Sequence, residues 1–208
     1  MGKIILSEFV SLDGVIQDPA GNEGFRVGGW VGQITDREEL DKIKYDEALR
    51  AEALLLGRRS YEFFAARWQP RRGVLADRLS ILPKYVVSST LEDPDWNNST
   101  ILKGDVVSEV SKLKQEVNGD IVVYASFQLL RTLIEHDLVD ELRLMIYPIV
   151  LGTGQRLFGE INEKKPMRLV DTQTIADGIA FLTYEARPRR LSGSQRRETG
   201  GCWEGPRG

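Results

Sequence analysis

Two arginines follow a short apolar run in the segment Gly57-Arg58-Arg59-Ser60-Tyr61-Glu62. The run Ala53–Leu56 is short enough to be a buried strand, and the residues after Ser60 favour a helix. Gly57 permits a sharp turn at the strand end, and Ser60 is a candidate N-cap. A helix N-terminus beside two guanidinium groups is typical of a phosphate site. A solvated arginine pair explains the same residues about equally well.

A second strand-to-helix junction has small residues at its turn. The strand Ile121–Tyr124 meets Ala125-Ser126-Phe127-Gln128, and a helix follows that contains Leu129 and Leu130. Two such turns from separate strand–helix units can face one ligand, with one turn at each phosphate group. The pair of turns is therefore a candidate site for one ligand that has phosphate groups.

The segment Ser11-Leu12-Asp13-Gly14 places a carboxylate beside a glycine at the end of the first predicted strand. Asp13 could hydrogen-bond a ligand, but an Asp-Gly turn is the more common use of this pair. Residues 17–34 form a long glycine-rich loop, which is typical of a lid or a binding loop. Its Phe25 and Trp30 either cover a flat ring or anchor the loop to the core.

Composition limits the class of protein. The chain has 208 residues and a net charge of -3, which fits one domain and argues against general nucleic-acid binding. Its single cysteine, Cys202, and single histidine, His136, exclude a disulfide framework and give no basis for a metal site. No apolar run approaches a membrane span. We expect a cytoplasmic protein without a metal or a membrane partner.

The order of the predicted elements indicates the architecture. Strands and helices alternate in the first part of the chain, which favours a mostly parallel sheet with helices on its faces. Met167–Ile175 and Ile179–Glu185 are predicted as a final antiparallel hairpin, so the sheet is mixed. In total we expect about eight strands and four or five helices.

One predicted helix starts at a capping box, Thr35-Asp36-Arg37-Glu38, and runs to about Arg50. Leu40, Ile43 and Ala48 are expected to face the core. The charged residues between them are expected to form a mostly solvated face: Asp41, Lys42, Lys44, Asp46 and Glu47.

The chain is divided into residues 1–187, one domain, and residues 188–208, a tail. The tail is rich in Arg, Ser and Gly and has no apolar pattern, which predicts disorder. A vector-derived or frame-shifted end would explain this composition. The tail is therefore left out of the functional interpretation.

Several segments together resemble a known family. The segment from Gly57 to Glu62 is similar to a motif of the dihydrofolate reductase superfamily. The start Ser11-Leu12-Asp13-Gly14 resembles the C-terminal reductase domain of riboflavin-biosynthesis deaminase–reductases (RibD). Stand-alone bacterial relatives of that domain share stretches similar to Gly24–Trp30, Leu138–Leu144 and Pro148–Phe158. The resemblance spans residues 3 to about 186.

This resemblance implies a three-layer α/β/α fold with a mixed, eight-stranded central sheet, a homodimer, and NADPH as the hydride donor. For the cofactor, the resemblance places Arg58 and Arg59 near the 2′-phosphate, with Gly57 and Ser60 at the helix start, and it places Ser88 and Ser89 at the adenine ribose. The pyrophosphate would be bound by the second turn, which consists of Ala125, Ser126, Phe127, Gln128 and Leu129. In the substrate pocket, Asp13 would be the catalytic or orienting group, with Trp30 over it. The family usually has glycines where this chain has Ala125-Ser126-Phe127.

We therefore expect an NADPH-dependent reductase of a small heterocyclic compound of the pteridine or pyrimidine type. Two alternatives remain open. One is a non-catalytic small-molecule or nucleotide binder in which Phe127 fills the cofactor channel. The other is a structural module that dimerises through its edge strands.

Overall fold

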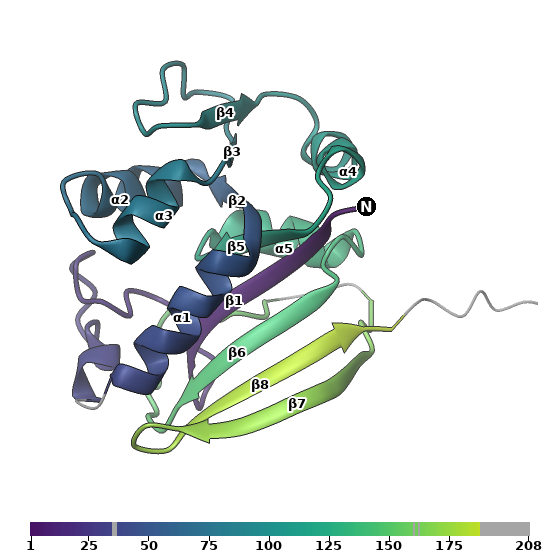
Figure 1. The fold of residues 1–208 in the computed structure, drawn as a ribbon. Coiled ribbons are helices and arrows are strands. Elements are labelled where there is room, and N and C mark those ends of the chain that lie inside the picture. Colours follow the sequence, from purple (N-terminus) through teal and green to yellow (C-terminus); the bar gives the residue numbers. More distant parts are fainter. Residues whose placement is uncertain (35–36, 160, 162, 188–208) are drawn as a thin grey trace, which may run out of the picture.

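The fold is built on one sheet of eight strands in the order β4-β3-β2-β5-β1-β6-β8-β7 (Figure 1). The computed structural model describes residues 1–34, 37–159, 161 and 163–187. The strands are β1 (Lys3–Ser11), β2 (Ala51–Gly57), β3 (Lys84–Val87), β4 (Ser99–Leu102), β5 (Asp120–Tyr124), β6 (Glu141–Tyr147), β7 (Met167–Ile175) and β8 (Ile179–Ala186). The predicted number of strands is confirmed.

Strand direction divides the sheet into two parts. β1 runs parallel to β5 and β6, β2 to β3 and β5, and β3 to β4. β8 lies between β6 and β7 and is antiparallel to both. The predicted mixed sheet is confirmed. Because parallel strands end at the same edge, the turns that follow β1, β2, β3 and β5 are brought to one side of the molecule.

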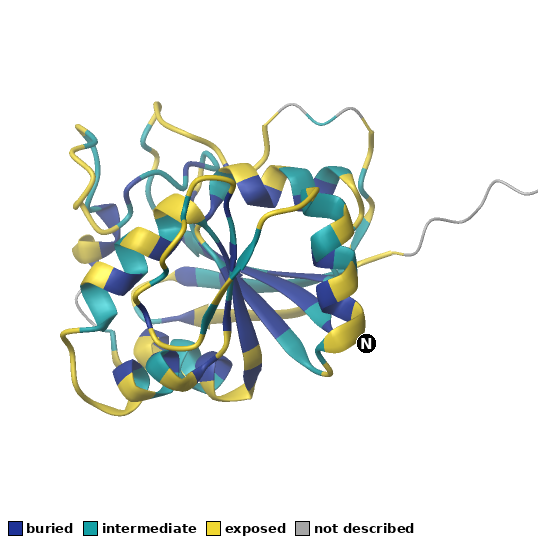
Figure 2. Cartoon of the chain, turned by 90° about the horizontal axis from the view of Figure 1, so that it is seen from above, coloured by how far each residue is buried: buried dark blue, intermediate teal, exposed yellow. Residues whose placement is uncertain are grey.

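Helices cover both faces of the sheet, which gives three layers (Figure 2). One face carries α4 (Val106–Glu116) and α5 (Phe127–Glu135), and the other carries α1 (Glu38–Arg50), α2 (Arg58–Trp68) and α3 (Val74–Ile81). A short 3₁₀ helix, η1 (Trp30–Gln33), lies in the long loop after β1. None of the helices in the described ranges has the length and apolar character needed to cross a bilayer.

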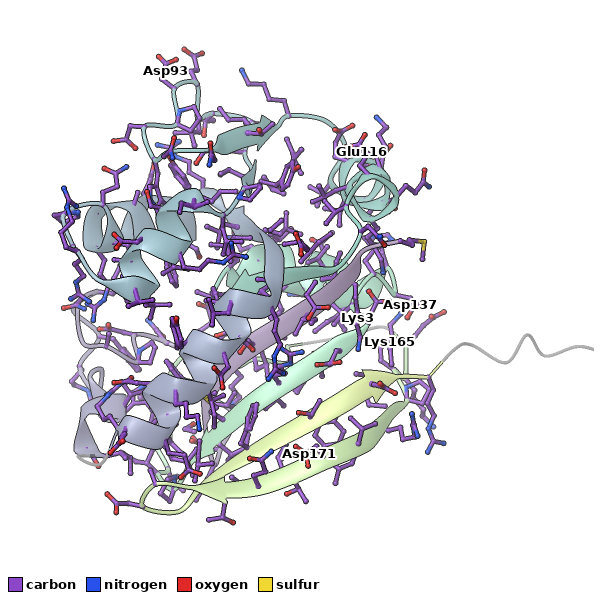
Figure 3. All side chains as sticks on the ribbon, viewed as in Figure 1. Lys3, Asp93, Glu116, Asp137, Lys165 and Asp171 are labelled. Carbon is purple, nitrogen blue, oxygen red and sulfur yellow. The ribbon has the colours of Figure 1, made fainter. Side chains whose placement is uncertain are left out.

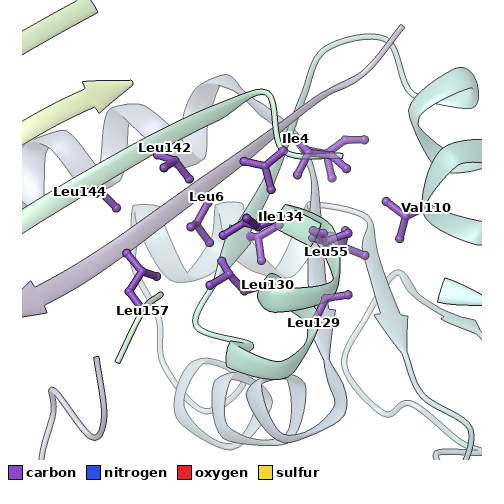
Figure 4. Close-up of a cluster of buried hydrophobic side chains, with 14 of the residues drawn as sticks. Ile4, Leu6, Leu55, Val110, Leu129, Leu130, Ile134, Leu142, Leu144 and Leu157 are labelled. Carbon is purple, nitrogen blue, oxygen red and sulfur yellow. The ribbon is translucent and has the colours of Figure 1, made fainter. Parts of the chain in front are cut away.

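The core follows the two-residue period of the strands. Leu54 and Leu56 of β2 pack beneath α2, whereas Ala53 and Leu55 face α4 and α5. Figure 4 shows the cluster on the α4–α5 side, where Leu55 lies among apolar side chains from both the strands and the helices. On β1, the same alternation places Glu8 on the face of its neighbours Leu6 and Val10, both buried in that cluster.

The start of α2 differs from the prediction. Gly57 is the N-cap, with φ −77° and ψ 159°, and the helix begins directly at Arg58. Ser60 is therefore the third helical residue, and its predicted role as N-cap is wrong. The strand passes into the helix without an intervening loop, because extended backbone at Gly57 connects directly to the first turn. The capping-box residues 35–36 and the tail 188–208 lie outside the described residues.

Candidate active site

Two strand-to-helix turns touch at the carboxyl edge of the sheet. The backbone N–H of Gly57, at the end of β2, donates a hydrogen bond of 2.9 Å to the hydroxyl oxygen of Ser126, after β5. The same hydroxyl donates to the carbonyl of Tyr124 at 3.1 Å. Ser126 thus joins the two turns that the sequence suggested would face one ligand.

The turn after β5 has an unusual backbone. Ala125 and Ser126 have φ values of 51° and 67°, in the left-handed region that glycine occupies readily. Phe127 then begins α5. A left-handed residue followed by a right-handed one turns successive N–H groups toward a common point, and such a nest binds anions. The N–H groups at the start of α5, which include those of Gln128 and Leu129, add to this effect.

The two arginines at the start of α2 have different environments. Arg58 forms an ion pair with Glu62 at 2.7 Å and donates to the hydroxyl of Thr90 at 2.5 Å. Arg59 is exposed. Burial raises the pKa of Glu23 and the charge of Arg59 opposes this rise, but no hydrogen bond of the Arg59 guanidinium is found in the part of the chain that the structure describes. Arg59 is thus the freer of the two to meet an incoming anion.

The two serines after β3 also differ. Ser88 is buried, and its hydroxyl accepts hydrogen bonds from the backbone N–H groups of Thr90 and Leu91 at 3.2 and 2.9 Å. Ser89 is exposed on the same turn. Ser88 shapes the turn, and Arg58 bridges to it through Thr90, so three turns are linked along this edge.

Asp13 connects two loops. Its carboxylate accepts hydrogen bonds from the Ser11 hydroxyl at 2.7 Å and from the N–H groups of Leu151 and Gly152 at 3.1 and 2.8 Å. The bond from Ser11 and those from Leu151 and Gly152 lower the pKa of Asp13 to about 2. Asp13 is therefore ionised at neutral pH and holds the loop after β6 against the loop after β1.

The loop between β1 and α1 is organised by a buried aspartate. The carboxylate of Asp18 accepts hydrogen bonds from the N–H groups of Asn22, Glu23 and Phe25. Trp30 is only 1% exposed, donates its indole N–H to the carbonyl of Gln17, and meets Tyr147 edge to face. Of the two roles considered for Trp30, covering a flat ring or anchoring the loop, its burial fits the second: Trp30 fixes the loop to the core.

A polar cluster lies between α1 and the sheet. The carboxylate of Glu47, 4% exposed, pairs with Lys44 at 3.3 Å and with Arg143 of β6 at 3.2 Å. Burial raises the pKa of Glu47, but Lys44, Arg143 and hydrogen bonds from Tyr124 and Ser7 outweigh it, so the pKa is below its ordinary value. The prediction of a solvated face is wrong for Lys44 and Glu47.

Helical spacing was the signal that could have placed Lys44 and Glu47 on the face of α1 that packs against the sheet. Lys44 and Glu47 follow the buried Leu40 by four and seven residues, which places all three on one face of α1. Glu8 is a further group that the sequence did not reveal. It is 8% exposed, and burial raises its pKa to about 8 despite the lowering effect of Lys44.

No group of histidine, cysteine or carboxylate side chains within the described ranges has the arrangement of a metal site. The anion-binding features are instead backbone N–H groups, two helix N-termini and Arg59. Such a set suits a phosphorylated ligand.

Known proteins are similar to this chain in sequence and in fold. The protein YyaP of Bacillus subtilis (strain 168), itself uncharacterised, is 29% identical over 188 residues, which cover 88% of this chain and 94% of YyaP. The crystal structure of a putative riboflavin biosynthesis protein from Shewanella sp. PV-4 superposes with a TM-score of 0.73 at 20% identity, covering 89% of this chain and 99% of that one.

Dihydrofolate reductase from Enterococcus faecalis, in a complex with NADP(H) and RAB-propyl, superposes with a TM-score of 0.54 at 15% identity. The match covers 89% of this chain and 97% of that enzyme. The predicted dihydrofolate reductase-like fold is confirmed. The family model of the RibD C-terminal domain matches residues 2–181. This chain belongs to the RibD C-terminal domain family.

Proposed function

We propose that this protein is an NADPH-dependent oxidoreductase that reduces a small heterocyclic substrate of the pteridine or pyrimidine type. The observation that carries the proposal is the bond between Gly57 and Ser126, which holds two helix N-termini at one edge of the sheet. Family membership supports a reductase, and similar proteins are named for riboflavin biosynthesis and for dihydrofolate reduction.

The residues at this edge suit a dinucleotide phosphate. The nest at Ser126 and Phe127 would hold the pyrophosphate through backbone N–H groups. Arg59, with Arg58 beside it, would meet the 2′-phosphate, and the turn at Ser88 and Ser89 would border the adenine ribose. When bound, the nicotinamide supplies the hydride. The protein's part is to bind and orient the reactants.

Asp13 would act by orientation. Its low pKa leaves no proton to donate at neutral pH, and both of its oxygens already accept N–H or O–H groups. We assign it the task of fixing the loop at Leu151 and Gly152 beside the substrate pocket. A proton donor for the reduction must come from another group or from water.

Calorimetric titration of the purified protein with NADPH, and separately with NADH, tests the proposal. We expect micromolar NADPH affinity and weaker NADH affinity. Arg59→Ala should weaken NADPH binding by about 10-fold or more, the usual effect of losing a charged hydrogen bond, and leave NADH binding almost unchanged. Arg72→Ala removes a guanidinium from an exposed loop and serves as the control. Absence of NADPH binding at millimolar concentration would overturn the proposal.

A non-catalytic ligand-binding protein is the second candidate. It is favoured by the half-buried Phe127 and by alanine at position 125, where a cofactor approaches more easily over glycine. The two candidates differ in one measurement. A binder would take up NADPH or another nucleotide but would not oxidise NADPH in the presence of any pteridine or pyrimidine dione tested.

We also propose that the protein forms a homodimer through β7. This strand is at the edge of the sheet, and no helix covers it on the face shown in Figure 3, where Asp171 is labelled. Leu169 and Val170 on it are 47% and 41% exposed. An exposed apolar edge strand offers unpaired backbone groups to a second copy. Sedimentation analysis of Leu169→Arg against the unaltered protein tests this, with a monomeric variant as the expected result.

A further inference from the structure

The ammonium group of Lys44 is held at a fixed point above the sheet. Its Nζ donates to the hydroxyl of Ser7 at 2.5 Å and lies 3.3 Å from a carboxylate oxygen of Glu47. It also lies 5.1 Å from the ring centre of Phe9 and 5.0 Å from that of Tyr124. Both distances are in the range of cation–π attraction. Contacts from β1, β5 and α1 itself thus position a single cation.

These contacts leave the ammonium with spare hydrogen-bonding capacity. A lysine ammonium has three N–H donors, and Ser7 and Glu47 are the two acceptors found for it among the described residues. Glu47 is shared with Arg143, which lies at 3.2 Å, and it also receives hydrogen bonds from Ser7 and Tyr124. The negative charge of Glu47 is therefore neutralised by Arg143 as well as by Lys44. The Lys44 side chain is 16% exposed.

The position of Lys44 relates it to the nucleotide-binding turns. Tyr124, whose ring lies beneath the ammonium, is the last residue of β5, and its carbonyl accepts the hydrogen bond from Ser126. Phe9 on β1 is two residues before Ser11, which bonds to Asp13. Lys44 therefore lies between the turn that would hold the pyrophosphate and the loop that Asp13 fixes.

We infer that Lys44 is the substrate-recognition group of this site and selects ring compounds that present a hydrogen-bond acceptor, such as a ring carbonyl or an anionic oxygen, at their edge. The inference rests on the proposed function and specifies its substrate class. A cationic ring would be repelled at the same position. Phe9 and Tyr124 are positioning residues, because their rings hold the ammonium where the third N–H can reach the ligand.

Lumazine, a flat pteridine dione, and N-methylquinolinium, a flat cation, are suitable probes for calorimetry on the full chain. Lys44→Met keeps the length of the side chain and removes its charge. It should weaken lumazine binding by about 10-fold or more. Lys44→Arg should restore part of the affinity, and N-methylquinolinium should bind the unaltered protein more weakly than lumazine. Lys42→Met, at an exposed position of the same helix, is the control.

A second variant guards against a general loss of folding. Phe9→Leu keeps an apolar side chain and the ammonium but removes one ring, and it should weaken lumazine binding several-fold. NADPH affinity should be unchanged in both Lys44→Met and Phe9→Leu. Equal lumazine affinity in Lys44→Met and the unaltered protein would overturn the inference, and so would absence of lumazine binding at millimolar concentration. Absence of NADPH binding would instead refute the proposed function, while the lumazine comparison still decides the role of Lys44.

Discussion

Replacing Glu8 with glutamine should change how the stability of this protein depends on pH. Glu8 lies in the central strand β1, and its Oε1 atom is buried without a hydrogen-bond partner within the described ranges. Burial raises its pKa from 4.5 to about 8, with a smaller opposing effect of Lys44. At neutral pH the folded protein therefore keeps a proton on Glu8, whereas the unfolded chain does not.

The direction and size of the effect follow from this difference in proton binding. Between pH 4.5 and about 8, the folded state binds one more proton at Glu8 than the unfolded state. The free energy of unfolding must fall as the pH rises through that range. One pKa unit corresponds to about 1.4 kcal/mol, so the contribution of Glu8 amounts to a few kcal/mol by the upper end of the range. Above about pH 8, Glu8 is ionised in both the folded and the unfolded state, so its contribution to the free energy of unfolding no longer changes with pH.

Glu8→Gln keeps the shape of the protonated carboxyl group and cannot ionise. Urea unfolding at about pH 5 and about pH 8 should show a smaller loss of stability for the variant than for the unaltered protein. Glu92→Gln, at an exposed loop position, should leave the profile of the unaltered protein unchanged. Parallel stability profiles for Glu8→Gln and the unaltered protein would refute a protonated Glu8.

Three further predictions concern the loops around the site. Ala125→Gly should stabilise the fold by about 0.5–1 kcal/mol in urea unfolding, because relief of the left-handed conformation exceeds the added freedom of the unfolded chain. Asp13→Asn should lower stability at pH 7 by about 1 kcal/mol, and since the pKa of Asp13 is about 2, the difference should disappear as the pH falls toward that value. Gly28→Ala should destabilise the loop around Asp18, because the added Cβ would lie 2.4 Å from the Asp18 Oδ2. Hydrogen exchange of the backbone amides in residues 18–30 should therefore become faster. An unchanged exchange rate would contradict this contact.

The sequence predicted the sheet because its strands are short apolar runs at regular intervals. Ala53–Leu56 and Ile121–Tyr124 were found as buried strands, and they pair in parallel as β2 and β5. Their carboxyl ends share an edge, so the prediction that the two following turns face one ligand needed only the rule for parallel strands. The rule for parallel strands does not say whether two neighbouring turns touch. The hydrogen bond from Gly57 to Ser126 was therefore not predictable from the sequence.

The cluster around Lys44 was missed because its partners are distant in the sequence. Ser7 lies 37 residues before Lys44, and Arg143 lies 96 residues after Glu47. Charged residues on a helix are usually solvated, and a single sequence contains no sign that an arginine from a later strand will neutralise one of them. A charged side chain is buried where an oppositely charged partner lies next to it, and for Glu47 that partner is Arg143 of β6.

Alanine and serine are present at the second turn, where the resemblance led us to expect glycines, yet the backbone has the conformation that glycine readily adopts. Ala125 and Ser126 both have positive φ values, and the hydroxyl of Ser126 bonds to Gly57 and to Tyr124. Strained conformations persist where surrounding contacts determine them, and they are concentrated at functional sites. Serine at position 126 supplies such contacts, which glycine could not. The change in residue type therefore preserves the geometry of an anion-binding turn, and it ties this turn to the arginine turn through a bond that a glycine sequence would lack.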